Sequence, residues 1–186
     1  MGLLVAAAAC GSSGGGSTSK SKSTTSETTT SASSGVHLEL TSSAFTDGGA
    51  IPSQYTCDGA GQSPPLSWTG VPAGTASLAL RVQDIDTPTK FIHWLIYDIP
   101  PSTTSMAAGQ VPPGAKQATN SFGKQAYGGM CPPAGQRHRY VFTMLALGTE
   151  LTVSDSVSAS DLWSTLERSA VVGQGQLTGT YQRAGS

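Results

Sequence analysis

Charged side chains are scarce in this sequence. Of its 186 residues only 11% are Asp, Glu, Lys or Arg, and the formal net charge is −1, whereas an ordinary soluble domain carries about 25% charged residues. A protein that binds nucleic acid through phosphates needs an excess of basic side chains, and this excess is missing. No apolar run approaches the roughly 18 residues that a membrane-spanning helix needs.

Motifs of nucleophilic and metal chemistry are missing as well. The sequence has no G-x-S-x-G, H-E-x-x-H or P-loop pattern, and no C-x-x-C metal spacing. Asp84, His93 and His138 could form an acid–base set or a metal triad, but their order has no metal-like spacing. We therefore expect a non-catalytic protein without a metal or other cofactor.

The first ten residues, MGLLVAAAAC, resemble the end of a bacterial lipoprotein signal peptide. We predict that residues 1–10 are the remnant of such a peptide and that Cys10 is lipidated. The segment departs from the motif in two ways: the basic start is missing, and Ala7 stands where the motif usually has Leu. A start codon placed too far downstream would explain the first departure. The alternative is a frayed terminus with an incidental cysteine.

Residues 11–35 contain 10 Ser, 6 Thr and 5 Gly. Such a stretch cannot bury enough apolar surface to offset chain entropy, so we predict a disordered tether. With Cys10 lipidated, the protein would be exported and held by its lipid at a membrane of the cell envelope; without lipidation it would be secreted.

Residues 36–183 form the predicted domain, and most of its regular segments are strand-like. Apolar and β-branched residues alternate or cluster between Gly and Pro turns. The expected strands are 37–40, 77–82, 92–98, 138–147 and 176–182.

One helix is expected after Ser158. The capping pattern Ser158 to Asp161 starts it, Leu162, Trp163, Leu166 and Ala170 would form its apolar face, and Gly173 would end it. Many strands with one or two peripheral helices indicate a mainly-β sandwich.

Strand alternation predicts which chemical groups share a face. His37 is expected to be solvated. The expected sets are His138, Tyr140, Phe142 and Met144; His93, Leu95 and Tyr97; and Leu78, Leu80, Val82 and Asp84.

Cys57 and Cys131 are the two cysteines of the domain. In an exported protein they could form a disulfide, which would close a loop of roughly 75 residues. The alternative is two unpaired cysteines.

Five segments in a fixed order resemble the phosphatidylethanolamine-binding protein family, in its bacterial, Raf-kinase-inhibitor-like branch. They are Cys57-Asp58-Gly59 with Ser63 to Trp68, Asp84-Ile85-Asp86-Thr87-Pro88, His93-Trp94, Gly128 to Gly135 with His138-Arg139-Tyr140, and Leu177 to Arg183. The resemblance covers residues 38–183.

This resemblance implies a β-sandwich of Greek-key type with a small anion pocket at one rim. Carried over to this sequence, the pocket residues are Asp84, Asp86, His93, Gly129, Pro132, His138 and Tyr140. Imidazole and phenol groups would donate hydrogen bonds to a phosphate, and Asp84 would orient an imidazole. Ile85 and Met130 replace prolines of the family pattern, at positions that shape the loop.

Three hypotheses of function follow. The first is a non-catalytic binding protein for small phosphate-containing ligands or phospholipid head groups. The second, which the resemblance suggests, is an inhibitor or interaction protein with a kinase or protease as its partner. The third, which the missing motifs disfavour, is a hydrolytic enzyme.

Overall fold

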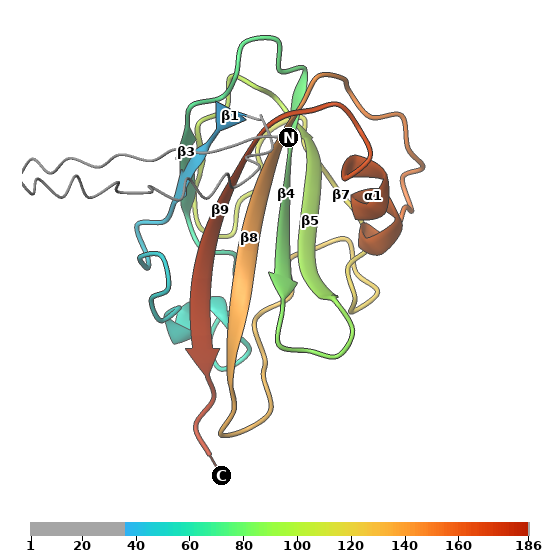
Figure 1. Cartoon of the computed structure of the whole chain (residues 1–186). Coiled ribbons are helices and arrows are strands. Elements are labelled where there is room, and N and C mark those ends of the chain that lie inside the picture. The colour runs from blue at the N-terminus through green and yellow to red at the C-terminus, as the bar shows by residue number, and fades with distance from the viewer. Residues whose placement is uncertain (1–35, 186) are drawn as a thin grey trace, which may run out of the picture. The chain divides into compact units, whose positions relative to one another are not determined.

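Two β-sheets and one short α-helix make up the part of the chain that the structure, a computed structural model, describes: residues 36–185 (Figure 1). The large sheet has the order β1 (Val36–His37), β9 (Val171–Gln182), β8 (Arg137–Leu147), β4 (Ser77–Asp84), β5 (Phe91–Ile99) and β7 (Lys116–Gln117). The small sheet has the order β2 (Glu39–Thr41), β3 (Leu66–Thr69) and β6 (Ser105–Met106). A 3-10 turn, η1 (Ser53–Tyr55), and α1 (Ala159–Leu166) complete the elements.

The predicted mainly-β fold is confirmed. The predicted signal-peptide remnant with Cys10 and the tether of residues 11–35 lie outside the described residues. Within residues 36–185 no helix is long and apolar enough to cross a membrane.

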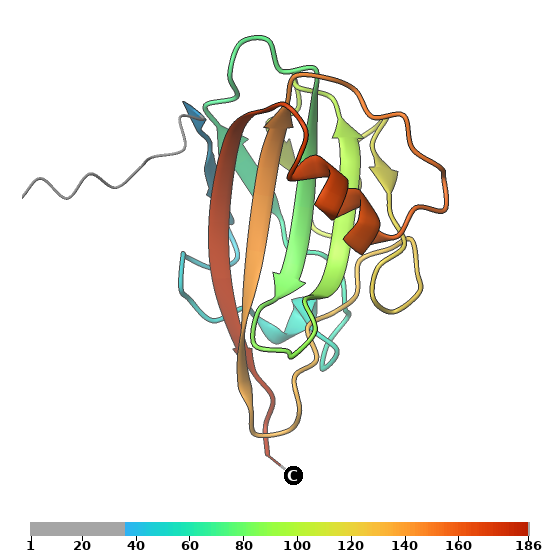
Figure 2. The ribbon, with the colours of Figure 1, turned by 45° about the vertical axis from the view of Figure 1, so that its right-hand side comes forward.

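The paired strands β4 and β8 form the centre of the large sheet. They are antiparallel in unbroken register from Ser77 opposite Leu147 to Asp84 opposite Tyr140. Alternate side chains of these strands enter two different cores. One core, which includes Leu80, lies between the two sheets. The second core, which includes Ala79, lies between the large sheet and α1 (Figure 2).

The segment expected as one strand over 37–40 is two short strands. β1 pairs in parallel with β9 in the large sheet, whereas β2 pairs with β3 in the small sheet. Leu38 lies between them, is fully buried and belongs to the core between the sheets. The chain therefore passes from the large sheet to the small sheet at Leu38, which is buried between them.

The helix begins where the capping pattern predicts. Oγ of Ser158 accepts the backbone N–H of Asp161 over 3.1 Å, which satisfies one of the free donors of the first turn. Leu162, Trp163 and Leu166 are buried against the sheet.

The predicted end of the helix is wrong. The helix ends at Leu166, so Ala170 is not part of its face, and Gly173 lies inside β9. The backbone of β9 pairs with β8 from Val171 onward, and this ladder replaces further helix hydrogen bonds. Gly173 is required there by close packing, since a Cβ would lie 2.8 Å from side-chain atoms of Leu38 and Pro72.

A disulfide joins Cys57 to Cys131, with their Cα atoms 5.4 Å apart. The two residues are 74 positions apart in the sequence. The bond ties the loop after η1 to the loop that precedes β8.

We expect the double substitution Cys57→Ser and Cys131→Ser to lower the free energy of unfolding by about 4 kcal/mol, because the unfolded chain then regains the entropy of a long open loop. Urea unfolding of the two chains, both carrying Cys10→Ser, measures this difference. A reductant should destabilise only the chain that has the disulfide. Equal stability of the two chains would contradict the prediction.

Candidate functional site

Most of the predicted site residues meet at one end of the large sheet, the lower end in Figure 1. β4 ends at Asp84, β5 begins at Phe91 and β8 begins at Arg137. Because β4 is antiparallel to both neighbours, its end lies beside their starts. His37 lies elsewhere, on β1, and is exposed.

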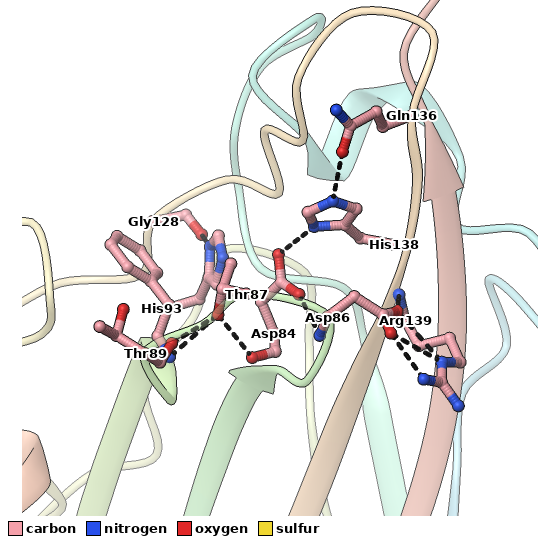
Figure 3. A network of polar contacts seen from close by, with 10 residues as sticks. Asp84, Asp86, Thr87, Thr89, His93, Gly128, Gln136, His138 and Arg139 are labelled. Carbon is pink, nitrogen blue, oxygen red and sulfur yellow. Dashed lines mark hydrogen bonds and ion pairs between the residues drawn. The ribbon is translucent and has the colours of Figure 1, made fainter.

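A buried hydrogen bond joins Asp84 to His138 at this strand end (Figure 3). Nδ1 of His138 donates to Oδ2 of Asp84 over 2.7 Å, and Nε2 lies 3.3 Å from Oε1 of Gln136. Oδ1 of Asp84 accepts the backbone N–H of Asp86 over 2.9 Å. A carboxylate only accepts hydrogen bonds, so a neutral His138 ring carries its proton on Nδ1, which faces Asp84. Its Nε2 lies on the side of the ring away from Asp84.

His93 occupies a β-bulge near the start of β5. On β4 the partner of Val82 is Trp94 and the partner of Gln83 is Ile92, so His93 between them has no partner on β4. A bulge adds one residue to one strand and thereby changes the direction of the side chains that follow or precede it.

The prediction that His93 shares a face with Leu95 and Tyr97 is therefore wrong. Leu95 and Tyr97 pack in the core beneath α1. The ring of His93 instead packs edge-to-face against Tyr140, which belongs to the core between the sheets, with 5.3 Å between ring centroids. The bulge moves the imidazole to the face that carries Asp84 and His138.

The imidazole of His93 is held through one nitrogen only. Its Nδ1 donates to the backbone oxygen of Gly128 over 2.9 Å, and Nε2 has no hydrogen-bond partner among the described residues. Burial lowers the pKa of His93, and the nearby Asp84 and the backbone of Gly128 and Gly129 oppose this effect in part. The neutral ring therefore presents the lone pair of Nε2.

The hydroxyl of Tyr140 is fully buried and has no hydrogen-bond partner among the described residues. Burial and the neighbouring carboxylate of Asp84 raise its pKa, so the hydroxyl keeps its proton. Buried donors are normally paired, because an unpaired one costs free energy. The hydroxyl of Tyr140 is thus buried beside the Asp84 carboxylate, without a hydrogen bond of ordinary length, at the strand end where the two imidazoles lie.

Gly129 and Pro132 shape the loop beside the imidazoles. A Cβ on Gly129 would lie 2.9 Å from the backbone carbon of Thr56 and 3.0 Å from the nitrogen of Cys57. Met130 is fully buried in the core, and its backbone oxygen accepts the N–H of Cys57. Pro132 is buried. These residues hold two loops against each other, and Met130 fills the core where the family pattern has proline.

Asp86 does not join the imidazoles. Its carboxylate pairs with the guanidinium of Arg139, with 2.5 Å between Oδ1 and one terminal nitrogen, and accepts the backbone N–H of Arg139 over 2.7 Å. Ile85 beside it is exposed. Asp86 thus fastens the turn after β4 to the start of β8.

Three residues that contact His93 or His138 were not predicted from the sequence. Gln136 contacts His138, Asn120 bonds the backbone of His93, and Phe122 packs edge-to-face against the ring of His93 with 5.4 Å between centroids. The Asn-Ser-Phe-Gly turn around Asn120 was the one available signal, because Asn and Gly favour turns.

A cleft of about 290 Å³ borders the loop whose Gly128 bonds to the ring of His93. It is lined by Cys57, Asn120, Phe122, Lys124, Tyr127, Gly128, Gly129 and Cys131. Within residues 36–185 no three His, Cys, Asp or Glu side chains gather as metal ligands.

Known proteins resemble this chain over most of its length. A family described as "Phosphatidylethanolamine-binding protein" matches residues 41–182. A "UPF0098 protein" of Methanothermobacter thermautotrophicus is 44% identical over 152 residues, which cover 78% of this chain and 99% of the relative. A Mycobacterium tuberculosis protein named "Putative lipoprotein LppC" is 40% identical and covers 78% of this chain and 72% of its own length.

Solved structures share the fold. Escherichia coli YbcL, described as a member of the mammalian PEBP family, is 32% identical with a TM-score of 0.73, covering 78% of this chain and 98% of that one. A carboxypeptidase Y inhibitor in complex with its cognate proteinase is 17% identical with a TM-score of 0.50, covering 80% and 83%. This last likeness concerns the fold alone.

We expect Asp86→Ala to lower the free energy of unfolding at neutral pH by less than about 1 kcal/mol, since the pair with Arg139 is solvent-exposed. Arg139 lowers the pKa of Asp86 from 3.8 to about 2. A carboxyl group with a lowered folded-state pKa stabilises above its unfolded pKa and ceases to do so as pH falls through the folded value. Urea unfolding of both chains should therefore show a difference that shrinks between about pH 4 and pH 2. A difference that grows on acidification would contradict the assignment.

Proposed function

The chain belongs to the phosphatidylethanolamine-binding protein family, and from this premise we propose that its strand-end site binds a small phosphate-containing ligand without catalysing a reaction. The site consists of Asp84, His93, His138 and Tyr140. Free inorganic phosphate and a phospholipid head group share the chemistry that this site would recognise.

The unpaired hydroxyl of Tyr140 is the observation that carries this proposal. It is a buried donor with a raised pKa, next to two imidazoles whose Nδ1 atoms are already engaged. A phosphate oxygen would accept from this hydroxyl and remove the cost of leaving it unpaired.

The imidazole of His93 would supply a further donor when protonated. Gly128 occupies its Nδ1, so an imidazolium at this position would direct its second proton, on Nε2, away from Gly128. On His138 the Nδ1 atom is bonded to Asp84 and Nε2 lies 3.3 Å from Oε1 of Gln136, so an anion there would take the place of Gln136. The site would thus hold an anion by hydrogen bonds from neutral and titratable groups, without Lys or Arg.

Tyr140→Phe is the sharpest test, because it removes only the hydroxyl. We expect this variant to be as stable as the parent or more stable, since an unpaired buried donor is lost. Its affinity for inorganic phosphate should fall by about ten-fold or more, because a hydrogen bond to a charged group contributes roughly 1.5–3 kcal/mol.

Isothermal titration calorimetry with the full chain measures this affinity, and urea unfolding measures the stability. Phosphoethanolamine in a parallel titration distinguishes a head group from free phosphate. The variant His37→Ala is the control, since His37 is exposed on β1. Unchanged phosphate affinity in Tyr140→Phe, or no binding by the parent chain, would overturn the proposal.

Anion affinity should rise as pH falls, because protonation of His93 converts its Nε2 from an acceptor into a donor. Burial lowers the pKa of His93 below its ordinary value of 6.5, so the contribution of His93 should appear below that pH. Sulfate is the suitable probe between about pH 5 and pH 8, because its own charge stays constant while histidine titrates. An affinity that does not change over this range would contradict a protonation-linked role.

We further propose that the protein is exported and lipid-anchored through Cys10. The relative named as a lipoprotein supports this proposal, as does the small-residue run before the cysteine. Fractionation of cells that express the chain should find it with the membrane, and Cys10→Ser should release it.

The hypothesis of a kinase or protease inhibitor stays a prediction. The inhibitor of carboxypeptidase Y resembles this chain in fold alone, at 17% identity. A pull-down with the parent chain and with Tyr140→Phe would test whether any protein partner depends on the site.

A further inference from the structure

The segment between β7 and β8 crosses the start of β5, and one buried side chain holds it there. Asn120 is only 5% exposed. Its backbone N–H donates to the oxygen of Lys124 over 2.9 Å, and its backbone oxygen accepts the N–H of Gly123 over 2.9 Å. The turn that follows Asn120 therefore closes on Asn120 itself.

The side-chain amide of Asn120 makes four further hydrogen bonds. Oδ1 accepts the backbone N–H of Phe122 over 2.9 Å and that of Lys124 over 3.0 Å. Nδ2 donates to the backbone oxygen of His93 over 3.1 Å and to that of Ala126 over 2.7 Å. An amide is the only side-chain group with two donors and an acceptor oxygen in one plane, so the pattern uses its full capacity.

These bonds converge on the bulged residue of β5. The backbone oxygen of His93 accepts from Asn120 and also from the N–H of Gly128 over 3.0 Å. The backbone oxygen of Gly128 in turn accepts from Nδ1 of His93. The segment that Asn120 closes thus bonds both the main chain and the ring of His93.

Asn120 also places an aromatic wall beside the imidazole. The ring of Phe122, whose N–H bonds to Asn120, packs edge-to-face against His93 and against Phe91, with 4.9 Å between the two phenyl centroids. The imidazole therefore lies between Phe122 on one side and Tyr140 on another.

We propose that Asn120 is a positioning residue of the site: it fixes the orientation of the His93 imidazole through the backbone of His93 and Gly128, without contacting the ligand. Only the expected effect of Asn120 on ligand affinity rests on the proposed function; its effect on the orientation of His93 does not. A bulged residue lacks a ladder partner on one side, so its orientation depends on the contacts that replace that partner.

The test is Asn120→Ala, followed by the titration of His93 in NMR spectra of the full chain. The titratable groups that face His93 are Asp84 at the end of β4 and His138 and Tyr140 on β8, and the variant leaves all three in place. We expect the His93 pKa to rise toward its ordinary value as the loop loosens and the ring becomes hydrated. Phosphate affinity should fall at least five-fold.

Ser77→Ala is the matched control. Ser77 is 2% exposed, its Oγ donates to the backbone oxygen of Thr149 over 3.0 Å, and it lies at the opposite end of β4 from Asp84. The substitution Ser77→Ala therefore removes a buried hydrogen bond from a side chain to the backbone, at a position that does not contact the site. If Asn120→Ala changes the His93 titration no more than Ser77→Ala does, Asn120 is merely structural and the proposal is overturned.

A measurement on the parent chain keeps the test valid if the variant does not fold. The two side-chain amide protons of Asn120 should exchange slowly with solvent, and Nδ1 should carry the proton of neutral His93. Rapid exchange or the opposite tautomer would overturn the proposal. Absence of phosphate binding by the parent chain would instead overturn the proposed function, because the His93 titration requires no ligand.

Discussion

The unbroken antiparallel pairing of β4 with β8 is the constraint on which the rest of the structure depends. It sets Asp84 opposite Tyr140 and brings His138, two residues earlier on β8, within hydrogen-bond distance of the Asp84 carboxylate. The same register sends alternate side chains into the core between the sheets and into the core beneath α1. A slip of one residue would exchange the two faces and separate the carboxylate from the imidazole.

The bulge at His93 is a departure of β5 from regular alternation that places a side chain in the site. It turns an imidazole from the helix-covered face to the face of Asp84, at the cost of a missing partner on β4. The loop from Asn120 to Gly128 replaces that partner with hydrogen bonds to the backbone and ring of His93. Fold and site are therefore coupled at a single residue of β5.

The motif residues divide into groups with different physical roles. Asp84, His93, His138 and Tyr140 lie together at the strand end, whereas Asp86 pairs with Arg139 and Gly129 packs against another loop. A shared sequence motif does not separate these roles, because a loop needs residues that shape it as well as residues that face a ligand. Burial and hydrogen-bond partners distinguish them.

The sequence by itself determined the family, the mainly-β fold, most of the long strands and the cap of α1, because these depend on local patterns and ordered motifs. It predicted the wrong face for His93 and the wrong end for the helix, since a bulge and a β-ladder are settled by pairing with a distant strand. Nothing near Asn120 in the sequence indicates its bonds to His93, 27 residues earlier. Only the tertiary structure decided which groups meet, because the contact between Asp84 and His138 joins residues 54 apart and forms only once β4 and β8 are paired.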